Sequence, residues 1–278
     1  MTEAVATDVP PAPLRFAALL VADLHLTPAD APGLARLTEF LRLAPAHAPE
    51  LWILGDLFDL WLTGDERALP AFAPLLAAFR AAAASGLVIR FLPGNRDFNF
   101  TRADGAAVGI TVSEQEEVDA TLGGTPTRLL HGDQLLTGDH GYQALKRVVR
   151  SGPARWLARH LPAALPLAIG RRIRRYSDRV VPRKEAGRLR IVAAEVERRL
   201  AAGARRVVCG HVHRLERWSL PAGELLVLPP FCDRGEFVAV AGLEPAAALC
   251  ALPPLWLGTV GGALVPLPTA TAPRGAGD

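Results

Sequence analysis

The chain has 278 residues, half of them hydrophobic, so it can bury a sizeable core as one large domain or as one domain with an insertion. Its longest apolar runs, 16–22 and 161–170, are far shorter than the roughly 20 residues of a membrane-spanning helix. The first fourteen residues lack Lys, Arg and an apolar core, and the three cysteines form no CxxC pair. We therefore expect no secretory signal in these residues and a reducing, cytoplasmic compartment.

The net charge of +3 is distributed unevenly along the chain. Residues 146–190 contain fourteen Lys or Arg and two acidic residues, a net charge of +12, whereas the rest of the chain carries −9. We interpret this segment as a cationic module whose partners are anionic. The alternative is a solvated helical pair with a buried apolar face.

Short apolar stretches bounded by turn residues predict five strands, at 15–22, 51–54, 87–92, 128–130 and 205–209. Helical patterns at 33–44 and 69–84 separate the first three strands, which predicts an α/β core with parallel pairing. Residues 141–202 are mostly helical in pattern and are interrupted by prolines. Alternating stretches after Val212 predict antiparallel strands, and the last dozen residues predict disorder.

These patterns suggest a division of the chain into three parts. We expect a flexible N-terminus at 1–14, and a main domain at 15–245 that contains a helical insertion at about 141–202. A C-terminal extension at 246–278 follows, with an end that is expected to be disordered.

Polar side chains follow each of the five predicted strands. In chain order they are Asp23 and His25, then Asp56, then Asn95, then His131, and last His211 and His213. In open α/β sheets, ligand sites form at the carboxyl edge, so we expect these side chains to converge. Carboxylates mixed with imidazoles suit divalent manganese, iron or zinc better than calcium.

Each pair of ligands taken alone has an ordinary structural explanation, because a single D-x-H or H-x-H is more often a surface or core feature than a metal site. Five such signals together favour a site that holds two cations, with one aspartate able to bridge them. Asp59, three residues beyond Asp56, is as well suited to cap the next helix as to bind metal.

The motifs D-x-H, G-D-x-x-D, G-N-R-D, H-G-D and G-H-x-H follow one another between Asp23 and His213. This series resembles the signature of the calcineurin-like metallophosphoesterases. The resemblance implies a β-sandwich flanked by helices and a centre with two divalent metal ions. It implies one metal bound by Asp23, His25, Asp56 and His213, and a second bound by Asp56, Asn95, His131 and His211, with Asp56 as the bridge.

The segments "GDLFDLW", "LPGNRDFNF" and "GDHGYQALK" are similar to the branch of that family that hydrolyses UDP-2,3-diacylglucosamine in lipid A biosynthesis. The resemblance implies a hydrolase that cleaves a diphosphate bond with a water activated by two metal ions, most simply Mn²⁺, beneath a helical lid that accepts acyl chains. Asn95, Arg96 and His211 would be catalytic. Substrate contacts would come from Asn95, Arg96, Asp139, Tyr142, Ser177, Lys184 and His211.

The partners that this resemblance implies are an acylated UDP-sugar and the anionic surface of the inner membrane, with no nucleic acid and no obligate protein partner. The chain differs from the branch at Val181, Val212 and Leu215. Two alternatives therefore stay open: a nuclease acting on RNA, and a broader phosphodiesterase acting on soluble nucleotides. Residues 146–190 contain only Trp156 and Tyr176 as aromatic residues, which is a thin set for base stacking.

Overall fold

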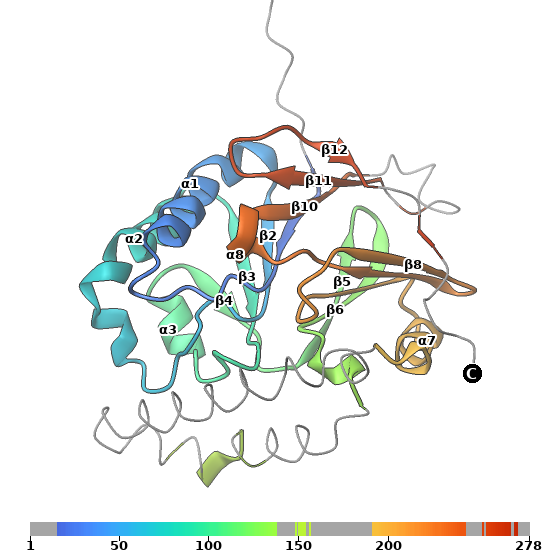
Figure 1. Cartoon of the computed structure of the whole chain (residues 1–278), viewed down its shortest axis with the longest axis horizontal. Helices are drawn as coiled ribbons and strands as arrows, with labels where there is room; N and C mark the ends of the chain where they lie inside the picture. The colour runs from blue at the N-terminus through green and yellow to red at the C-terminus, as the bar shows by residue number, and fades with distance from the viewer. Residues whose placement is uncertain are drawn as a thin grey trace, which may run out of the picture.

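The computed structural model describes residues 16–137, 148, 150–153, 156, 191–242, 252, 254–267 and 270–271. These residues form two β-sheets with helices on the outer faces (Figure 1). The α/β sandwich predicted from the sequence is confirmed. The predicted flexible N-terminus and most of the insertion at 141–202 lie outside the described residues.

The first sheet has seven strands in the order β12-β11-β10-β1-β2-β3-β4. Four of them run parallel: β1 (Ala18–Val21), β2 (Glu50–Leu54), β3 (Val88–Leu92) and β4 (Ile110–Val112). The other three pair antiparallel: β10 (Glu236–Val240), β11 (Leu255–Thr259) and β12 (Val265–Pro266). The parallel pairing expected from strand–helix alternation is therefore present in β1, β2 and β3.

The second sheet has five strands in the order β5-β6-β7-β9-β8. They are β5 (Glu117–Leu122), β6 (Thr125–Leu130), β7 (Arg206–Cys209), β8 (Glu216–Leu220) and β9 (Gly223–Val227). The prediction of antiparallel strands after Val212 is confirmed for β8 against β9 and for β10 against β1. It is incomplete for β9, which also runs parallel to β7 on its other side.

Two long helices, α1 (Ala31–His47) and α2 (Ala73–Ala84), cover the outer face of the first sheet (Figure 1). The predicted helix at 69–84 begins later than expected, because Pro70 opens a separate 3₁₀ turn and Pro74 stands in the first turn of α2. The shorter elements are η1 (Asp65–Ala68), η2 (Pro70–Phe72), α3 (Arg102–Ala106), η3 (Asp133–Leu135), α7 (Ala193–Ala201) and α8 (Phe231–Arg234). None of the helices in the described part of the chain has the length and apolarity needed to cross a bilayer.

Alternation of side chains along the strands builds the core. In β1, Leu19 and Val21 pack toward α1 and α2, whereas Ala18 and Leu20 face the second sheet. A third apolar cluster joins the second sheet to α7. Because each buried Leu or Val contributes about 1.5–3 kcal/mol, these layers hold the strand ends rigidly.

The C-terminal segment contacts the edges of both sheets. Strand β11 extends the first sheet by pairing with β10. Thr271 then pairs with β8 of the second sheet: its N–H donates to the Arg217 carbonyl at 3.0 Å, and its carbonyl accepts from the Ser219 N–H at 2.8 Å. Thr271 lies among the last dozen residues and is joined to β8 by these two main-chain hydrogen bonds, whereas the expected disorder of the C-terminal end stays a prediction.

Candidate metal centre

The loops that follow β1, β2, β3, β6 and β7 meet at one edge of the sandwich. The His211 N–H donates to Asp23 Oδ2 at 2.7 Å, which joins the loop after β7 to the loop after β1. The Arg96 N–H donates to Asp56 Oδ1 at 2.9 Å, which joins the loops after β3 and β2. His131 Nδ1 lies 2.9 Å from the Leu54 carbonyl oxygen, so the two sheets are in contact here.

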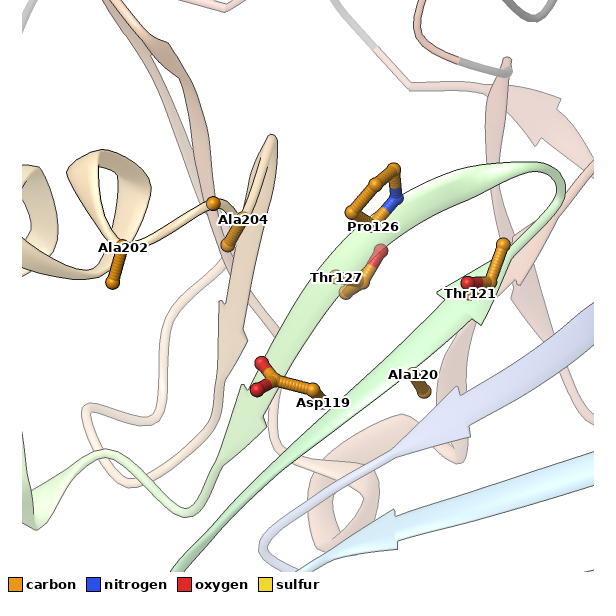
Figure 2. A pocket seen from close by; sticks show the side chains of 8 residues that line it. Asp119, Ala120, Thr121, Pro126, Thr127, Ala202 and Ala204 are labelled. Carbon is orange, nitrogen blue, oxygen red and sulfur yellow. The ribbon is translucent and has the colours of Figure 1, made fainter.

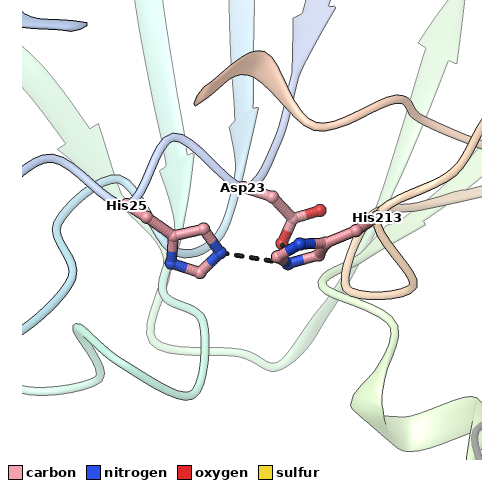
Figure 3. Close-up of side chains that lie close together, drawn as sticks. All are labelled: Asp23, His25 and His213. Carbon is pink, nitrogen blue, oxygen red and sulfur yellow. Dashed lines mark hydrogen bonds and ion pairs between the residues drawn. The ribbon is translucent and has the colours of Figure 1, made fainter. Parts of the chain in front are cut away.

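A first group of side chains consists of Asp23, His25 and His213 (Figure 3). The Nε2 atoms of His25 and His213 lie 3.0 Å apart, and His213 Nε2 lies 3.6 Å from Asp23 Oδ1. One ligand atom from each residue lies within 4.8 Å of the others. Three donors that converge in this way can hold one metal ion.

A second group consists of Asp23, Asp56 and His131. His131 Nε2 lies 2.9 Å from Asn95 Oδ1 and 3.7 Å from Asp56 Oδ2, and His211 Nδ1 lies 3.0 Å from the same His131 nitrogen. The structure thus brings together all seven side chains that the sequence assigned to metal.

The carboxylate of Asp56 connects the two groups. Its Oδ2 atom lies 3.9 Å from His25 Nδ1 on one side and 3.7 Å from His131 Nε2 on the other. Asp23, not Asp56, is the residue shared by both groups, which the sequence did not indicate, and Asp56 belongs to the second group alone. The bridging role of Asp56 therefore stays a prediction.

The backbone is strained where it carries these ligands. Within the described ranges, the non-glycine residues with positive φ are Asp23, His25, Asp56, His211 and His213, with φ between 48° and 70°. Such conformations cost about 1–3 kcal/mol each and persist where the surrounding structure enforces them. Every one of them falls on a predicted metal ligand, so the strain aims donor atoms into one space.

Glycine is needed beside the cluster. A Cβ atom at Gly94 would stand 2.5 Å from the Asp56 backbone nitrogen and would also overlap the Asp56 carboxylate. The first residue of G-N-R-D therefore has no side chain because the loop after β3 packs directly on the loop after β2.

Burial and charge within the cluster favour cation binding. Asp23 Oδ1 is buried and, among the residues that the structure describes, has no hydrogen-bond partner. Burial raises the pKa of the Asp23 carboxyl to about 7, and the neighbouring Asp56 charge adds to this effect. The charge of His131 lowers this pKa only in part, so the ionised carboxylate is still disfavoured and a bound cation would stabilise it.

The imidazoles are largely in the form that binds metal. Burial lowers the pKa of His25 to about 4 and that of His211 to about 3, so both rings are neutral near pH 7. His131 differs, because burial alone would lower its pKa but the carboxylates of Asp56 and Asp23 raise it. The donor set of carboxylates and neutral imidazoles therefore fits divalent metal ions.

Asp97, the last residue of G-N-R-D, has a role that the sequence did not assign. Its carboxylate is fully buried and accepts from the Gly94 N–H at 2.8 Å and from the Phe58 N–H at 3.2 Å. It thereby ties the loop that carries Asn95 to the loop that carries Asp56. The G-N-R-D motif was the feature of the sequence that could have identified Asp97 as a residue of the site.

Asp59 does not cap a helix. The next helical element is η1 at Asp65–Ala68, which begins after Gly64. The capping alternative was therefore wrong. Asp59 is buried near the site but is absent from both metal-ligand groups found among the described residues.

Arg96 lies beside the cluster, since its charge contributes to lowering the pKa of both His25 and His213. The predicted substrate residues Asp139, Tyr142, Ser177 and Lys184, together with Val181, lie outside the described residues.

Two departures from the family pattern have a structural explanation. Val212 packs against the cluster beneath α7, and Leu215 packs against the core between the sheets. Both add apolar packing next to the ligand loop after β7.

A pocket of about 340 Å³ lies between the β5–β6 hairpin and the end of α7, with Asp119, Thr127 and Ala204 among its lining residues (Figure 2). It borders the start of β6, whereas His131 follows the end of that strand. Asp119, its acidic lining residue, is paired with Arg128. This pocket is separate from the metal centre.

The two sheets and the joined groups of Asp and His ligands at their common edge define a calcineurin-like metallophosphoesterase. No protein-family model matches the chain. Over 198 residues it is 36% identical to the UDP-2,3-diacylglucosamine hydrolase of Pseudomonas putida, a match that covers 70% of this chain and 81% of that protein. Over 227 residues it is 32% identical to the UDP-2,3-diacylglucosamine hydrolase of Actinobacillus succinogenes, covering 81% and 94%. The chain therefore belongs to the UDP-2,3-diacylglucosamine hydrolase family.

Solved structures with a related arrangement include the Pseudomonas putida nuclease MPE, at a TM-score of 0.40 and 19% identity, covering 90% of this chain and 87% of that one. Another is Vacuolar Protein Sorting 29 from Cryptosporidium parvum, at a TM-score of 0.42 and 14% identity, covering 90% and 94%. Similarity at this level does not define an activity.

Proposed function

We propose that this protein hydrolyses the diphosphate bond of UDP-2,3-diacylglucosamine, releasing UMP and 2,3-diacylglucosamine 1-phosphate for lipid A biosynthesis. The observation that carries the proposal is the set of seven convergent Asp, Asn and His side chains in a chain that is 36% identical to an enzyme named for this substrate. A diphosphate is an anionic, kinetically resistant group, and a cation-binding centre is suited to its hydrolysis.

The centre holds two divalent ions in this proposal, and Mn²⁺ is the expected metal. One ion would be held by Asp23, His25, Asp56 and His213, and the other by Asp56, Asn95, His131 and His211. When bound, such ions neutralise phosphoryl charge and lower the pKa of a water molecule toward 7. The strained ligand backbones support this assignment, because they fix the donors before any ion arrives.

The chain's own residues bind and orient the substrate. Arg96 presents a planar guanidinium beside the cluster, which can donate two parallel hydrogen bonds to phosphoryl oxygens as charge develops. Asn95 and His211, which both contact His131, would bind the phosphoryl group in this proposal. Asp139, Tyr142, Ser177 and Lys184 complete the substrate contacts in this proposal.

The cationic segment 146–190 brings the enzyme to its lipid substrate as a lid at the cytoplasmic surface of the inner membrane. Its net charge of +12 supports this role, because each basic side chain near an anionic surface adds about 1 kcal/mol. In its described part, Val148 and Trp156 are 64% and 61% exposed, so apolar surface accompanies the charge. No nucleic acid and no obligate protein partner are part of the proposal.

The direct test is UMP release from acylated UDP-sugar in detergent, compared with UDP-glucose and with RNA. We expect activity on the acylated substrate that disappears with a chelator and returns with Mn²⁺. Preference for RNA would support the nuclease alternative, and equal turnover of UDP-glucose would support a phosphodiesterase of soluble nucleotides. Activity in a fully metal-stripped sample would overturn the metal assignment.

The membrane role has a separate test. Reversing Arg171, Arg172, Arg174 and Arg175 to Glu should sharply reduce sedimentation with anionic vesicles, and added salt should have the same effect on the parent protein. A single-site control is Arg42→Glu, which reverses one exposed charge on α1. Equal loss in the control would leave the segment without a specific membrane role.

A further inference from the structure

Arg150 is the residue of the cationic segment whose contacts the structure defines most fully. Its side chain is 17% exposed, and its guanidinium donates to the Gly94 carbonyl at 2.7 Å. The same group forms an ion pair with the Glu116 carboxylate and lies 5.7 Å from the centre of the Phe98 ring. Arg150 is therefore held in place by three partners.

The contact with Gly94 falls on the loop that carries the chemistry. The Gly94 carbonyl belongs to the peptide unit that continues into Asn95, so a hydrogen bond to this oxygen sets the orientation of that unit. The Asp97 carboxylate accepts a hydrogen bond from the Gly94 N–H, and the Asp56 carboxylate accepts one from the Arg96 N–H. The Arg150 bond anchors the same loop from its outer side.

Glu116 extends this connection to the loop after β6. Its carbonyl accepts from Gln134 Nε2 at 3.3 Å, and Gln134 Oε1 accepts from the Gly132 N–H at 3.0 Å. Gly132 directly follows His131. Glu116 thus links Arg150 to a second loop that carries a predicted metal ligand.

A neighbouring ion pair provides an internal comparison. Arg102 and Glu114 line the same surface pocket of about 340 Å³ as Arg150 and Glu116. Their side chains are each 67% exposed and lie 3.0 Å apart. A pair exposed to this degree contributes little to stability.

We propose that Arg150 is a positioning residue for hydrolysis: it orients the peptide between Gly94 and Asn95 and thereby places the Asn95 amide and the Arg96 guanidinium at the metal centre. This role rests on the proposed function. It also joins the start of the cationic segment to the metal centre, because one side chain belongs to the segment and contacts the ligand loop.

The test compares Arg150→Ala, Arg150→Lys and Glu116→Gln with the control Arg102→Ala in the full-length protein. Displacing a catalytic group by about 1 Å can lower a rate about 100-fold, so we expect Arg150→Ala to lower kcat by roughly 10- to 100-fold at saturating substrate. Lysine retains the positive charge and can donate to the Gly94 carbonyl, but it lacks the planar fork, so it should recover part of this loss. Arg102→Ala should stay within about twofold of the parent.

Calorimetric titration with Mn²⁺ provides a readout independent of turnover. Arg150→Ala should weaken one of two binding events by about tenfold, because the predicted ligand Asn95 is less well placed. Unchanged kcat and unchanged Mn²⁺ affinity would overturn the proposal. So would a loss confined to KM, or a loss matched by Arg102→Ala.

Two further outcomes separate the hypotheses. If Arg150→Ala does not fold, Arg150→Lys and Glu116→Gln decide the matter by the same two measurements. If the parent protein does not cleave acylated UDP-sugar, the proposed function fails, whereas the Mn²⁺ titrations still test whether Arg150 positions the ligand loop.

Discussion

Asp97→Asn isolates one charge beneath the metal centre while preserving side-chain shape. Burial, with the Asp56 charge as the next cause, raises the pKa of Asp97 from 3.8 to about 7 in the folded protein. A raised carboxyl pKa means that this group stabilises the fold below pH 3.8, and that the contribution is lost as pH rises toward 7. The amide substitution removes that titration.

The expected magnitude follows from linkage. Each pH unit between about 4 and 7 should shift the free energy of unfolding of Asp97→Asn, relative to the metal-free parent, by up to about 1.4 kcal/mol in favour of the variant. A constant loss of about 1–3 kcal/mol is superimposed, because the amide has one acceptor oxygen for the two buried N–H groups of Gly94 and Phe58. The pH slope is therefore the diagnostic quantity.

Urea unfolding of parent and variant in chelator, at several values between pH 4 and pH 8, measures this slope. The free energies of unfolding of parent and variant must be subtracted at each pH, because His25 and His211 also make stability depend on pH. Their lowered pKa values stabilise the fold increasingly as pH rises, equally in both proteins. Saturating Mn²⁺ should flatten the difference, since nearby positive charge favours the ionised carboxylate. A difference that does not change with pH in chelator would refute the reasoning.

Two other predictions address the metal ligands. Asp56→Asn should lower kcat/KM by about 1,000-fold and reduce the number of bound Mn²⁺ ions measured by equilibrium dialysis. The reason is the loss of a charge–charge interaction worth about 4 kcal/mol at 4 Å in a medium of intermediate dielectric. Asp59→Asn should have a smaller effect, and equal losses would mean that the wrong carboxylate was assigned. Because the pKa of Asp23 is raised to about 7, protons compete with the metal ion for this carboxylate below pH 7. Calorimetry should therefore show the Mn²⁺ affinity rising by up to about tenfold per pH unit between about pH 5.5 and pH 7. An affinity that stays constant over this range would contradict the competition.

Strong periodicity made much of the fold predictable from the sequence. Strand β1 is a buried apolar run, β2 and β3 are mostly buried and apolar, and α1 repeats Leu37, Phe40, Leu41 and Ala44 on one buried face. Strand β5 was missed because it is a polar edge strand with one fully buried residue. Its signal was the Gly123-Gly124 turn, where both φ values are positive and two residues close the hairpin with β6.

The convergence of the candidate ligands was predictable for a different reason: the carboxyl ends of parallel strands in one sheet share an edge, so the polar residues after β1, β2 and β3 approach one another, as do those after β6 and β7. That these residues bind metal stays a prediction. The supporting contacts were not predictable in this way. Asp97 and Arg150 form hydrogen bonds to backbone N–H and carbonyl groups, which every residue carries, so the sequence does not indicate these particular contacts.

The backbone conformation of the candidate metal ligands costs folding free energy. Five ligand residues with positive φ, at about 1–3 kcal/mol each, together cost as much as the entire net stability of an ordinary domain, about 5–15 kcal/mol. The buried carboxyl of Asp23 adds to this cost when it ionises. The apolar clusters that pack beneath these loops contribute to offsetting the strain. An ion that binds only the folded state returns stability in proportion to the logarithm of its concentration above Kd. The strained backbone therefore positions the ligands at a cost in stability, and bound cations would reduce that cost. The sandwich holds the donors in place, and the cations would relieve the repulsion between the carboxylates.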